Sequence, residues 1–165
     1  MEKLIRIGVD TSKSVFQLHG VDEAEQPMLR RKLRRAQFLA FFASLPPVRV
    51  AMEACGASHH WARQLQALGH EVALIPPQYV KPYVQRGKSD AADAEAICEA
   101  ASRPKLRKNF VPIKTPEQQS TQMLMKLRAQ FVGRRTQIAN SIRGYAAEFG
   151  VTAPRGLSRL DDVLA

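Results

Sequence analysis

The stretch LIRIGVDTSK, residues 4–13, decides the fold that this sequence predicts. Its isoleucines and valine favour a buried β-strand, and Gly8 within it allows a second backbone to come close. The strand ends by placing the carboxylate of Asp10 at a turn. Two interpretations of Asp10 fit this stretch alone: its side chain caps the turn DTSK, as Asp does in many turns, or it belongs to a functional site.

The residues that follow predict a sheet of five strands flanked by helices. After the first strand, strands are expected at 14–21, 28–36, 48–54 and 71–75, and helices at 37–45, 59–69 and 90–101. The strand, helix and strand between residues 48 and 75 have the spacing of a right-handed parallel crossover. The second strand is joined to the first by a hairpin, so the predicted sheet is mixed and the fold class is α/β.

A long helix is predicted after this sheet. Thr115, Pro116 and Gln118 combine a capping box with proline at the first helical position, which is a strong start signal. Apolar residues then recur every seven positions, at Leu124, Phe131, Ile138 and Tyr145. A helix of about 30 residues with such a seam indicates coiled-coil or bundle packing. Its partner would be another copy of the chain or a segment that the sequence does not contain, so we expect a homo-oligomer through residues 115–150.

Composition limits the class of protein. The chain has 165 residues, enough for one ordinary domain and an appendage. It is 45% hydrophobic, yet it has no apolar run near the ~20 residues that a membrane span requires. The start, MEKLIRIGVD, lacks the apolar region and cleavage site of a signal peptide. We therefore expect a cytoplasmic protein without a membrane partner, associated with the nucleoid when it binds DNA.

The positive charge is concentrated in the C-terminal third. The net charge is +10, and residues 1–99 hold 13 Lys and Arg against 11 Asp and Glu, whereas residues 100–165 hold 12 against 4. This asymmetry is typical of a nucleic-acid partner, although a solvated helix face explains it equally well. The candidate nucleic-acid contacts are Arg30, Arg31, Lys32, Arg34, Arg35, Lys88, Lys105, Arg107, Lys108, Lys126, Arg128, Arg134, Arg135 and Arg143.

Four carboxylates form the candidate catalytic and metal-binding site. Asp10 and Glu53 leave two predicted strands, while Asp90 and Asp93 lie three apart on the first turn of a helix and so share a face. Ends of neighbouring strands meet at one edge of a sheet, where α/β active sites occur. Oxygen-only clusters suit Mg²⁺ or Mn²⁺, and two such ions can act on a phosphodiester.

Each acid alone has a simpler explanation. The helix acids complement the positive end of their helix, Glu53 fits a salt bridge, and Asp10 fits a turn cap. The joint order of two strand acids followed by a helix pair favours the metal site.

The motifs that carry these acids resemble a known family. IGVDTSK, MEACG, IPP and GKSDAADAEAI are similar to the N-terminal half of the DEDD transposases of bacterial insertion sequences, the insertion-sequence-one-ten family, which includes RNA-bridged recombinases. The resemblance covers about residues 5–150. It implies an RNase H-like, RuvC-like domain whose metal ligands are Asp10, Glu53, Asp90 and Asp93, followed by a long helical segment. It also implies DNA as substrate and partner, and a guide RNA in some members.

The resemblance has one mild and one serious departure. The sequence has Lys-Ser-Asp where the family often has Lys-Thr-Asp. Family members also carry a C-terminal domain with a nucleophilic serine, and residues 151–165 supply no setting for it. We expect an RNase H-like domain at 1–104, a basic linker at 105–114, the long helix at 115–150 and the truncated start of a further region at 151–165. Complete strand transfer is not expected from this chain alone.

Two other functions remain open. A sugar-kinase or actin-like ATPase also begins with a strand carrying Gly-Val-Asp-Thr, but it needs a second Gly-rich phosphate loop, which the sequence lacks. The other alternative is a non-catalytic remnant that binds nucleic acid or dimerises.

Overall fold

The structure, a computed structural model, describes residues 3–84, 90–152 and 154–161, and for Asp90 it describes the backbone only. The chain divides into two compact units, Met1–Ile113 and Lys114–Ala165. Within the described ranges, every helix is too short or too polar to span a lipid bilayer. Lys88 lies outside the described residues.

The first unit is built on one mixed sheet. Its strands are β1 (Arg6–Thr11), β2 (Val15–Val21), β3 (Pro27–Arg34), β4 (Arg49–Glu53) and β5 (Glu71–Ile75). Their spatial order is β3-β2-β1-β4-β5. The pairs β1–β2 and β2–β3 are antiparallel, whereas β1–β4 and β4–β5 are parallel. The predicted fold class is confirmed: a mixed five-stranded sheet with flanking helices, followed by a long helix.

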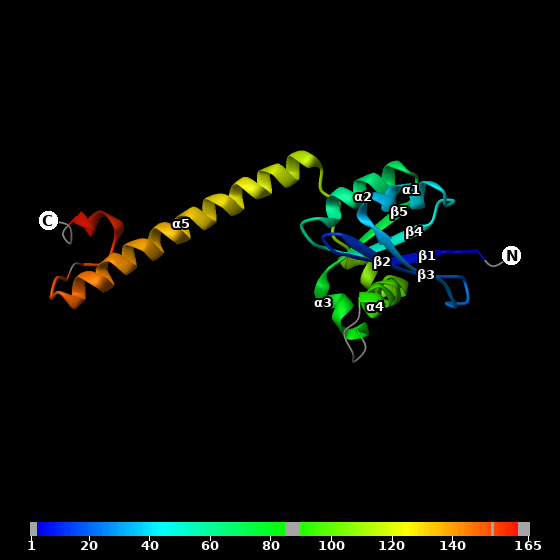
Figure 1. The fold of residues 1–165 in the computed structure, drawn as a ribbon, viewed down its shortest axis with the longest axis horizontal. Helices are drawn as coiled ribbons and strands as arrows, with labels where there is room; N and C mark the ends of the chain where they lie inside the picture. Colours follow the sequence, from blue (N-terminus) through cyan, green and yellow to red (C-terminus); the bar gives the residue numbers. More distant parts are fainter. Residues whose placement is uncertain (1–2, 85–89, 153, 162–165) are drawn as a thin grey trace. The chain divides into compact units, whose positions relative to one another are not determined.

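One face of the sheet is covered by α1 (Phe38–Ala43) and α2 (Ser58–Ala67), as Figure 1 shows. Aromatic rings fill this layer. The ring of Phe16 from β2 meets those of Phe38 and Trp61 edge-on, with centroids 4.6 and 5.2 Å apart, a favourable geometry for aromatic pairs. Ile7, Val9, Val50 and Met52 complete this core from β1 and β4.

The other face is covered by α4 (Asp90–Ser102) together with α3 (Pro77–Val80) and the short 3₁₀ turn Lys81–Tyr83 (Figure 1). This second core contains Ala51, Ile75 and the small residues on the inner side of α4. The closest approach is at Gly8, where an added Cβ would lie 2.2 Å from the carbonyl oxygen of Ala94 and 2.5 Å from the backbone nitrogen of Cys98. The close backbone approach that we expected at Gly8 is therefore made by α4.

Residues 104–113 belong to the first unit and pack against its two cores. They form a 3₁₀ helix, Pro104–Asn109, followed by an extended segment. Leu106 and Phe110 pack against the core beneath α4, and Ile113 packs against the other core. The N–H of Val111 donates to the carbonyl of Leu74 at 2.8 Å. The first compact unit thus includes most of the stretch 105–114, for which the sequence indicated a basic linker.

Several local details differ from the predicted elements. The strand expected at 28–36 ends at Arg34, and Arg35–Gln37 form a 3₁₀ turn leading into α1. Leu68, within the helix predicted at 59–69, follows the last residue of α2 and is 40% exposed. Of the two cysteines, Cys98 is buried and Cys55 is exposed. Cys55 is exposed because it lies in the turn between β4 and α2 instead of inside an element.

The second unit consists of α5 (Pro116–Glu148) and the residues after it. The predicted start is confirmed: the Thr115 side chain accepts from the Gln118 N–H, and the Gln118 side chain accepts from the Thr115 N–H. The seven-residue seam is exposed, with Leu124, Phe131, Ile138 and Tyr145 at 60–68%. After Gly150 the chain turns back, and Arg143 hydrogen-bonds to the carbonyl of Gly156, which precedes a short 3₁₀ turn at Leu157–Arg159.

Replacing Gly8 with Ala is expected to destabilise the first unit by about 1–3 kcal/mol, the usual cost of overpacking a core. The new Cβ would collide with the backbone of α4, which cannot move aside as a flexible side chain could. Thermal denaturation followed by circular dichroism measures the loss. Gly56→Ala is the matched control, because an added Cβ there has nothing within 4 Å. Equal melting temperatures for Gly8→Ala and wild type would contradict the close packing.

Candidate active site

Asp10 and Glu53 are brought together by the pairing of β1 with β4. These strands run parallel, with Val9 opposite Met52, so the next residues along each strand, Asp10 and Glu53, follow side by side. Val9 and Met52 point into the aromatic core. Since side chains alternate along a strand, Asp10 and Glu53 project to the opposite face, which α4 covers. Both are half-buried.

The third carboxylate comes from α4. Asp93 lines one cavity of about 420 Å³ together with Asp10 and Glu53, and the rest of its lining is Val80, Lys81, Val84 and Ile97. Three of the four predicted site residues therefore share a cavity. The fourth, Asp90, is the first residue of α4, one helical turn before Asp93, and its side chain lies outside the described residues. Among the side chains that are described, no three His, Cys, Asp or Glu are close enough together to hold a metal ion.

The electrostatics of the cavity show the cost of gathering these acids. Burial raises the pKa of Glu53, the negative charge of Asp93 raises this pKa further, and the ammonium of Lys81 opposes both effects. A single lysine between Val80 and Pro82 carries no sequence signal, so Lys81 was not a candidate from the sequence. Its place in the cavity depends on the turn formed by α3 and the following 3₁₀ residues.

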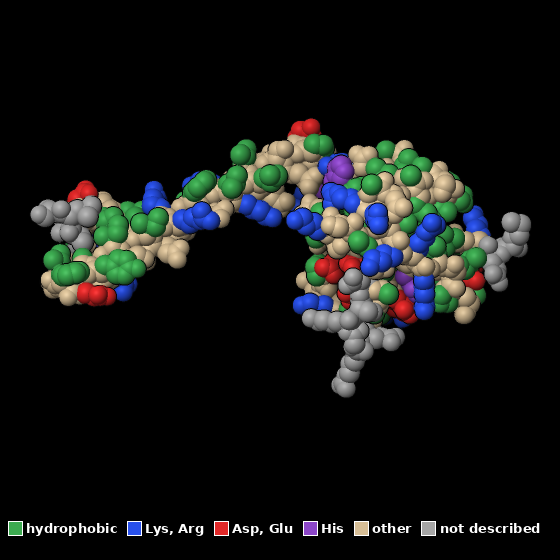
Figure 2. All heavy atoms as spheres, in the orientation of Figure 1, with side chains coloured by type: hydrophobic (Ala, Val, Ile, Leu, Met, Phe, Trp, Pro, Cys, Tyr) green, Lys and Arg blue, Asp and Glu red, His purple; other side chains and the backbone are tan. Residues whose placement is uncertain are grey.

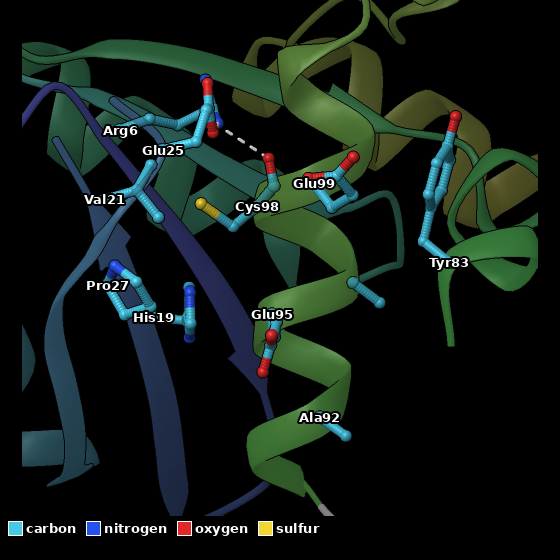
Figure 3. A pocket seen from close by; sticks show the side chains of 11 residues that line it. Arg6, His19, Val21, Glu25, Pro27, Tyr83, Ala92, Glu95, Cys98 and Glu99 are labelled. Atoms are coloured by element: carbon cyan, nitrogen blue, oxygen red, sulfur yellow. Dashed lines mark hydrogen bonds and ion pairs between the residues drawn. The ribbon is translucent and has the colours of Figure 1, made fainter. Parts of the chain in front are cut away.

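Helix α4 is held against the sheet by a buried arginine. Arg6 of β1 is 5% exposed, and its Nε donates to the carbonyl oxygen of Cys98 at 2.9 Å (Figure 3). The same guanidinium forms an ion pair with Glu25, which follows β2. Burial raises the pKa of the Cys98 thiol, and this shift is partly offset by the charge of Arg6. Arg6 was not a candidate from the sequence, because one arginine in an apolar strand does not reveal that it is buried.

The basic residues of β3 divide between the two faces of the sheet. Arg31 lies over the Phe41 ring at 5.1 Å and Arg35, just past the strand, over the Trp61 ring at 4.8 Å, both on the side of α1 and α2. Arg30 lies on the side of α4, with its guanidinium 3.8 Å from the carboxylate of Glu95. Lys32 and Arg34 are exposed. Figure 2 shows Lys and Arg side chains spread over the face that carries β2 and β3.

The remaining basic candidates lie on other elements. Lys105, Arg107 and Lys108 are exposed on the 3₁₀ helix after α4. Four more are exposed along α5: Lys126, Arg128, Arg134 and Arg135. Arg143 is only half-exposed, because it bonds to the Gly156 carbonyl within the second unit. Nucleic-acid contact by these residues stays a prediction.

Comparison with known proteins identifies the family. The model of a family described as "Transposase", the DEDD transposases of the IS110 type, matches residues 7–149. The chain belongs to this transposase family. The matched range includes all four predicted acidic residues, and the resemblance inferred from the sequence motifs is confirmed.

Individual transposases match the chain over nearly its full length. It is 58% identical over 164 residues to "Putative transposase y4pF/y4sB" of Sinorhizobium fredii, covering 99% of this chain and 42% of that protein. It is 46% identical over 164 residues to the transposase for insertion sequence element IS1111A of Coxiella burnetii, covering 99% and 44%. The chain thus spans less than half the length of the curated relatives that it matches.

A solved structure also resembles part of this IS110-type chain. Thermus thermophilus RuvC, in complex with a Holliday junction substrate, aligns with 61% of this chain and 93% of its own at 14% sequence identity, with a TM-score of 0.44.

Glu53→Gln is expected to raise the melting temperature of the metal-free protein at mildly alkaline pH. A raised pKa means that the folded chain holds the Glu53 proton more tightly than the unfolded chain, so stability falls as the pH rises through the folded pKa. The amide removes this loss. Below the ordinary glutamate pKa of about 4.3, the variant and wild type should melt alike.

Melting curves in the presence of a chelator, recorded across this pH range, test the expectation. Glu71→Gln is the control, because the exposed Glu71 lies at the other end of the sheet, where it pairs with Arg49 at 3.0 Å. A gain for Glu71→Gln as large as that for Glu53→Gln would contradict a local effect of the carboxylate cavity.

Proposed function

We propose that this chain carries the metal-dependent catalytic domain of a transposase, which cuts and transfers phosphodiester bonds of DNA during transposition. The observation that carries the proposal is the cavity shared by Asp10, Glu53 and Asp93. Membership of the transposase family supports the reaction class. We assign metal-ligand and catalytic roles to these three residues and to Asp90.

The donor chemistry of the cavity suits Mg²⁺ or Mn²⁺. Carboxylate oxygens are the preferred ligands of both ions, and a bound cation would relieve the repulsion that helps to raise the pKa of Glu53. When bound, two such ions stabilise the attacking and leaving oxygens of a phosphodiester. The chain holds Asp10 and Glu53 at one edge of the sheet, and α4 places Asp93 in the same cavity.

The proposed partners are DNA and, as the resemblance implies, a guide RNA. Phosphate contacts depend on Lys and Arg. The exposed basic residues of the 3₁₀ helix after α4, of α5, and of β3 where the side chain is not held over an aromatic ring supply them. We propose that complete strand transfer needs two parts: the acids described above, and the C-terminal serine domain that the resemblance implies.

We also propose that α5 associates with α5 of a second copy. Its seam of large apolar residues is exposed along the helix within the described part of the second unit, and exposed apolar seams at seven-residue spacing are typical of coiled coils. The non-catalytic remnant stays an alternative, and the outcome of the metal test below decides it. A kinase-like ATPase is disfavoured, because the sequence lacks a second Gly-rich phosphate loop.

Asp10→Asn is expected to weaken Mn²⁺ binding by more than about tenfold, since changes even in residues that only support metal ligands cost 10–100-fold. It should also abolish metal-dependent nicking of DNA. Isothermal titration with Mn²⁺ and a plasmid-nicking assay make the two measurements. Glu71→Gln, which removes a carboxylate far from the cavity, should change neither. If Mn²⁺ binding and cleavage are both independent of Asp10, the remnant interpretation is correct.

Replacing Phe131 and Ile138 together with Gln is expected to shift the chain toward monomer, because both side chains are more than half exposed in the single chain and belong to the seam. Light scattering coupled to size exclusion measures the mass. The control is Gln137→Ala, also on α5 and exposed but outside the seam. A wild-type chain that is monomeric at every accessible concentration would contradict association through α5.

A further inference from the structure

A polar row crosses the sheet from the carboxylates to its edge. The strand register pairs Asp10 of β1 with Gln17 of β2, and Gln17 with Lys32 of β3. On the other side of Asp10, the register of β4 places Glu53 beside it. Directly opposite residues of neighbouring strands project to the same face. Glu53, Asp10, Gln17 and Lys32 therefore stand in one line on the face that α4 covers.

The outer half of this row borders a groove of its own. A cavity of about 450 Å³ lies between the β2–β3 ribbon and the first turns of α4, and its lining includes Gln17, Arg30, Arg31, Lys32, Ala92 and Glu95. Asp93 and Ile97 of the same helix line the carboxylate cavity instead. The two cavities thus flank the N-terminal turns of α4. Ala92, on the first turns of α4 (Figure 3), lines this groove with a methyl group only.

The charges of the groove suit a phosphodiester. Arg30 is paired with Glu95 at 3.8 Å, so the carboxylate in the groove is offset by a cation. Lys32 is exposed, and it makes no ion pair with any described residue. Gln17 is half-buried beside it and carries an amide that can donate to a phosphate oxygen. The groove therefore offers a phosphate one cation without an ion pair to any described residue, Lys32, and one neutral donor, Gln17. In the adjoining carboxylate cavity the charged residues are three acids and Lys81.

We propose that this groove holds the backbone of the DNA strand that is cut, with Lys32 and Gln17 contacting phosphates next to the scissile one. Adjacent strands lie about 4.8 Å apart, so the backbone of Lys32 is roughly 10 Å from that of Asp10. A DNA strand bound in the groove would reach the carboxylates directly along the polar row. This inference rests on the proposed function, because it takes the carboxylates as the reaction centre.

Strand β3 also supplies a matched control residue. Arg31, the neighbour of Lys32, also borders the groove, but its guanidinium lies on the opposite face, over the ring of Phe41. Removing either charge changes the net charge of the domain by the same amount. Only Lys32 has its side chain on the face of the groove, so the two variants separate a specific contact from a general effect of charge.

The test measures binding of a fluorescein-labelled single-stranded thymidine oligonucleotide to the full chain, in chelator, over a series of salt concentrations. A phosphate contact contributes about 0.7 to the slope of log K against log salt for single strands. Lys32→Gln should lower the slope by about that amount, Lys32→Arg should restore it, and Arg31→Gln should leave it unchanged. Gln17→Ala should weaken binding by about 2- to 10-fold, the value of a neutral hydrogen bond, without a change in slope.

Mn²⁺ titration of the same proteins separates this inference from the proposed function. Lys32→Gln and Gln17→Ala should bind Mn²⁺ as wild type does, while Asp10→Asn should lose Mn²⁺ and keep the salt slope. Equal losses of slope for Lys32→Gln and Arg31→Gln would overturn the groove and leave the metal site intact. Unchanged Mn²⁺ binding by Asp10→Asn would overturn the metal site. The salt slopes of Lys32→Gln and Arg31→Gln would still decide whether the groove binds DNA.

Discussion

The contact between α4 and β1 at Gly8 is the constraint on which the rest of the first unit depends. No side chain separates the two backbones there, since even a Cβ on Gly8 would lie 2.2 Å from the carbonyl oxygen of Ala94. Arg6 holds the helix one turn further along, through the carbonyl of Cys98. These two contacts fix the height and the rotation of α4 over the sheet, and hence the distance from Asp93 to the acids of β1 and β4.

The site thus combines rigid geometry with unfavourable charge. Packing by small residues, which is indifferent to pH and salt, brings the carboxylates together. Burial and, after it, the negative charge of Asp93 raise the pKa of Glu53. Grouping acids at such a point lowers the stability of the fold, although the proposed function needs them there. The cation that we propose would reconcile stability with function, because it would turn the repelling oxygens into a set of ligands.

Much of this arrangement could be predicted from the sequence. The alternation of apolar residues located all five strands, and the capping box at Thr115 located the start of α5. The order of acids indicated a common region for Asp10, Glu53 and Asp93, which line one cavity. Lys81 and Arg6 could not be found in this way, because their roles depend on tertiary burial instead of a local pattern. Nor could the sequence show how the basic run of β3 divides, since Arg31 and Arg35 are held by rings of α1 and α2.

The two thiols of the chain differ in a way that is useful at the bench. Cys98 is 2% exposed behind Gly8, and burial raises its pKa, so little reactive thiolate is present. Cys55 is exposed and lies two residues after Glu53. A maleimide dye or spin label should therefore attach at one position without any engineering, in the turn that follows Glu53.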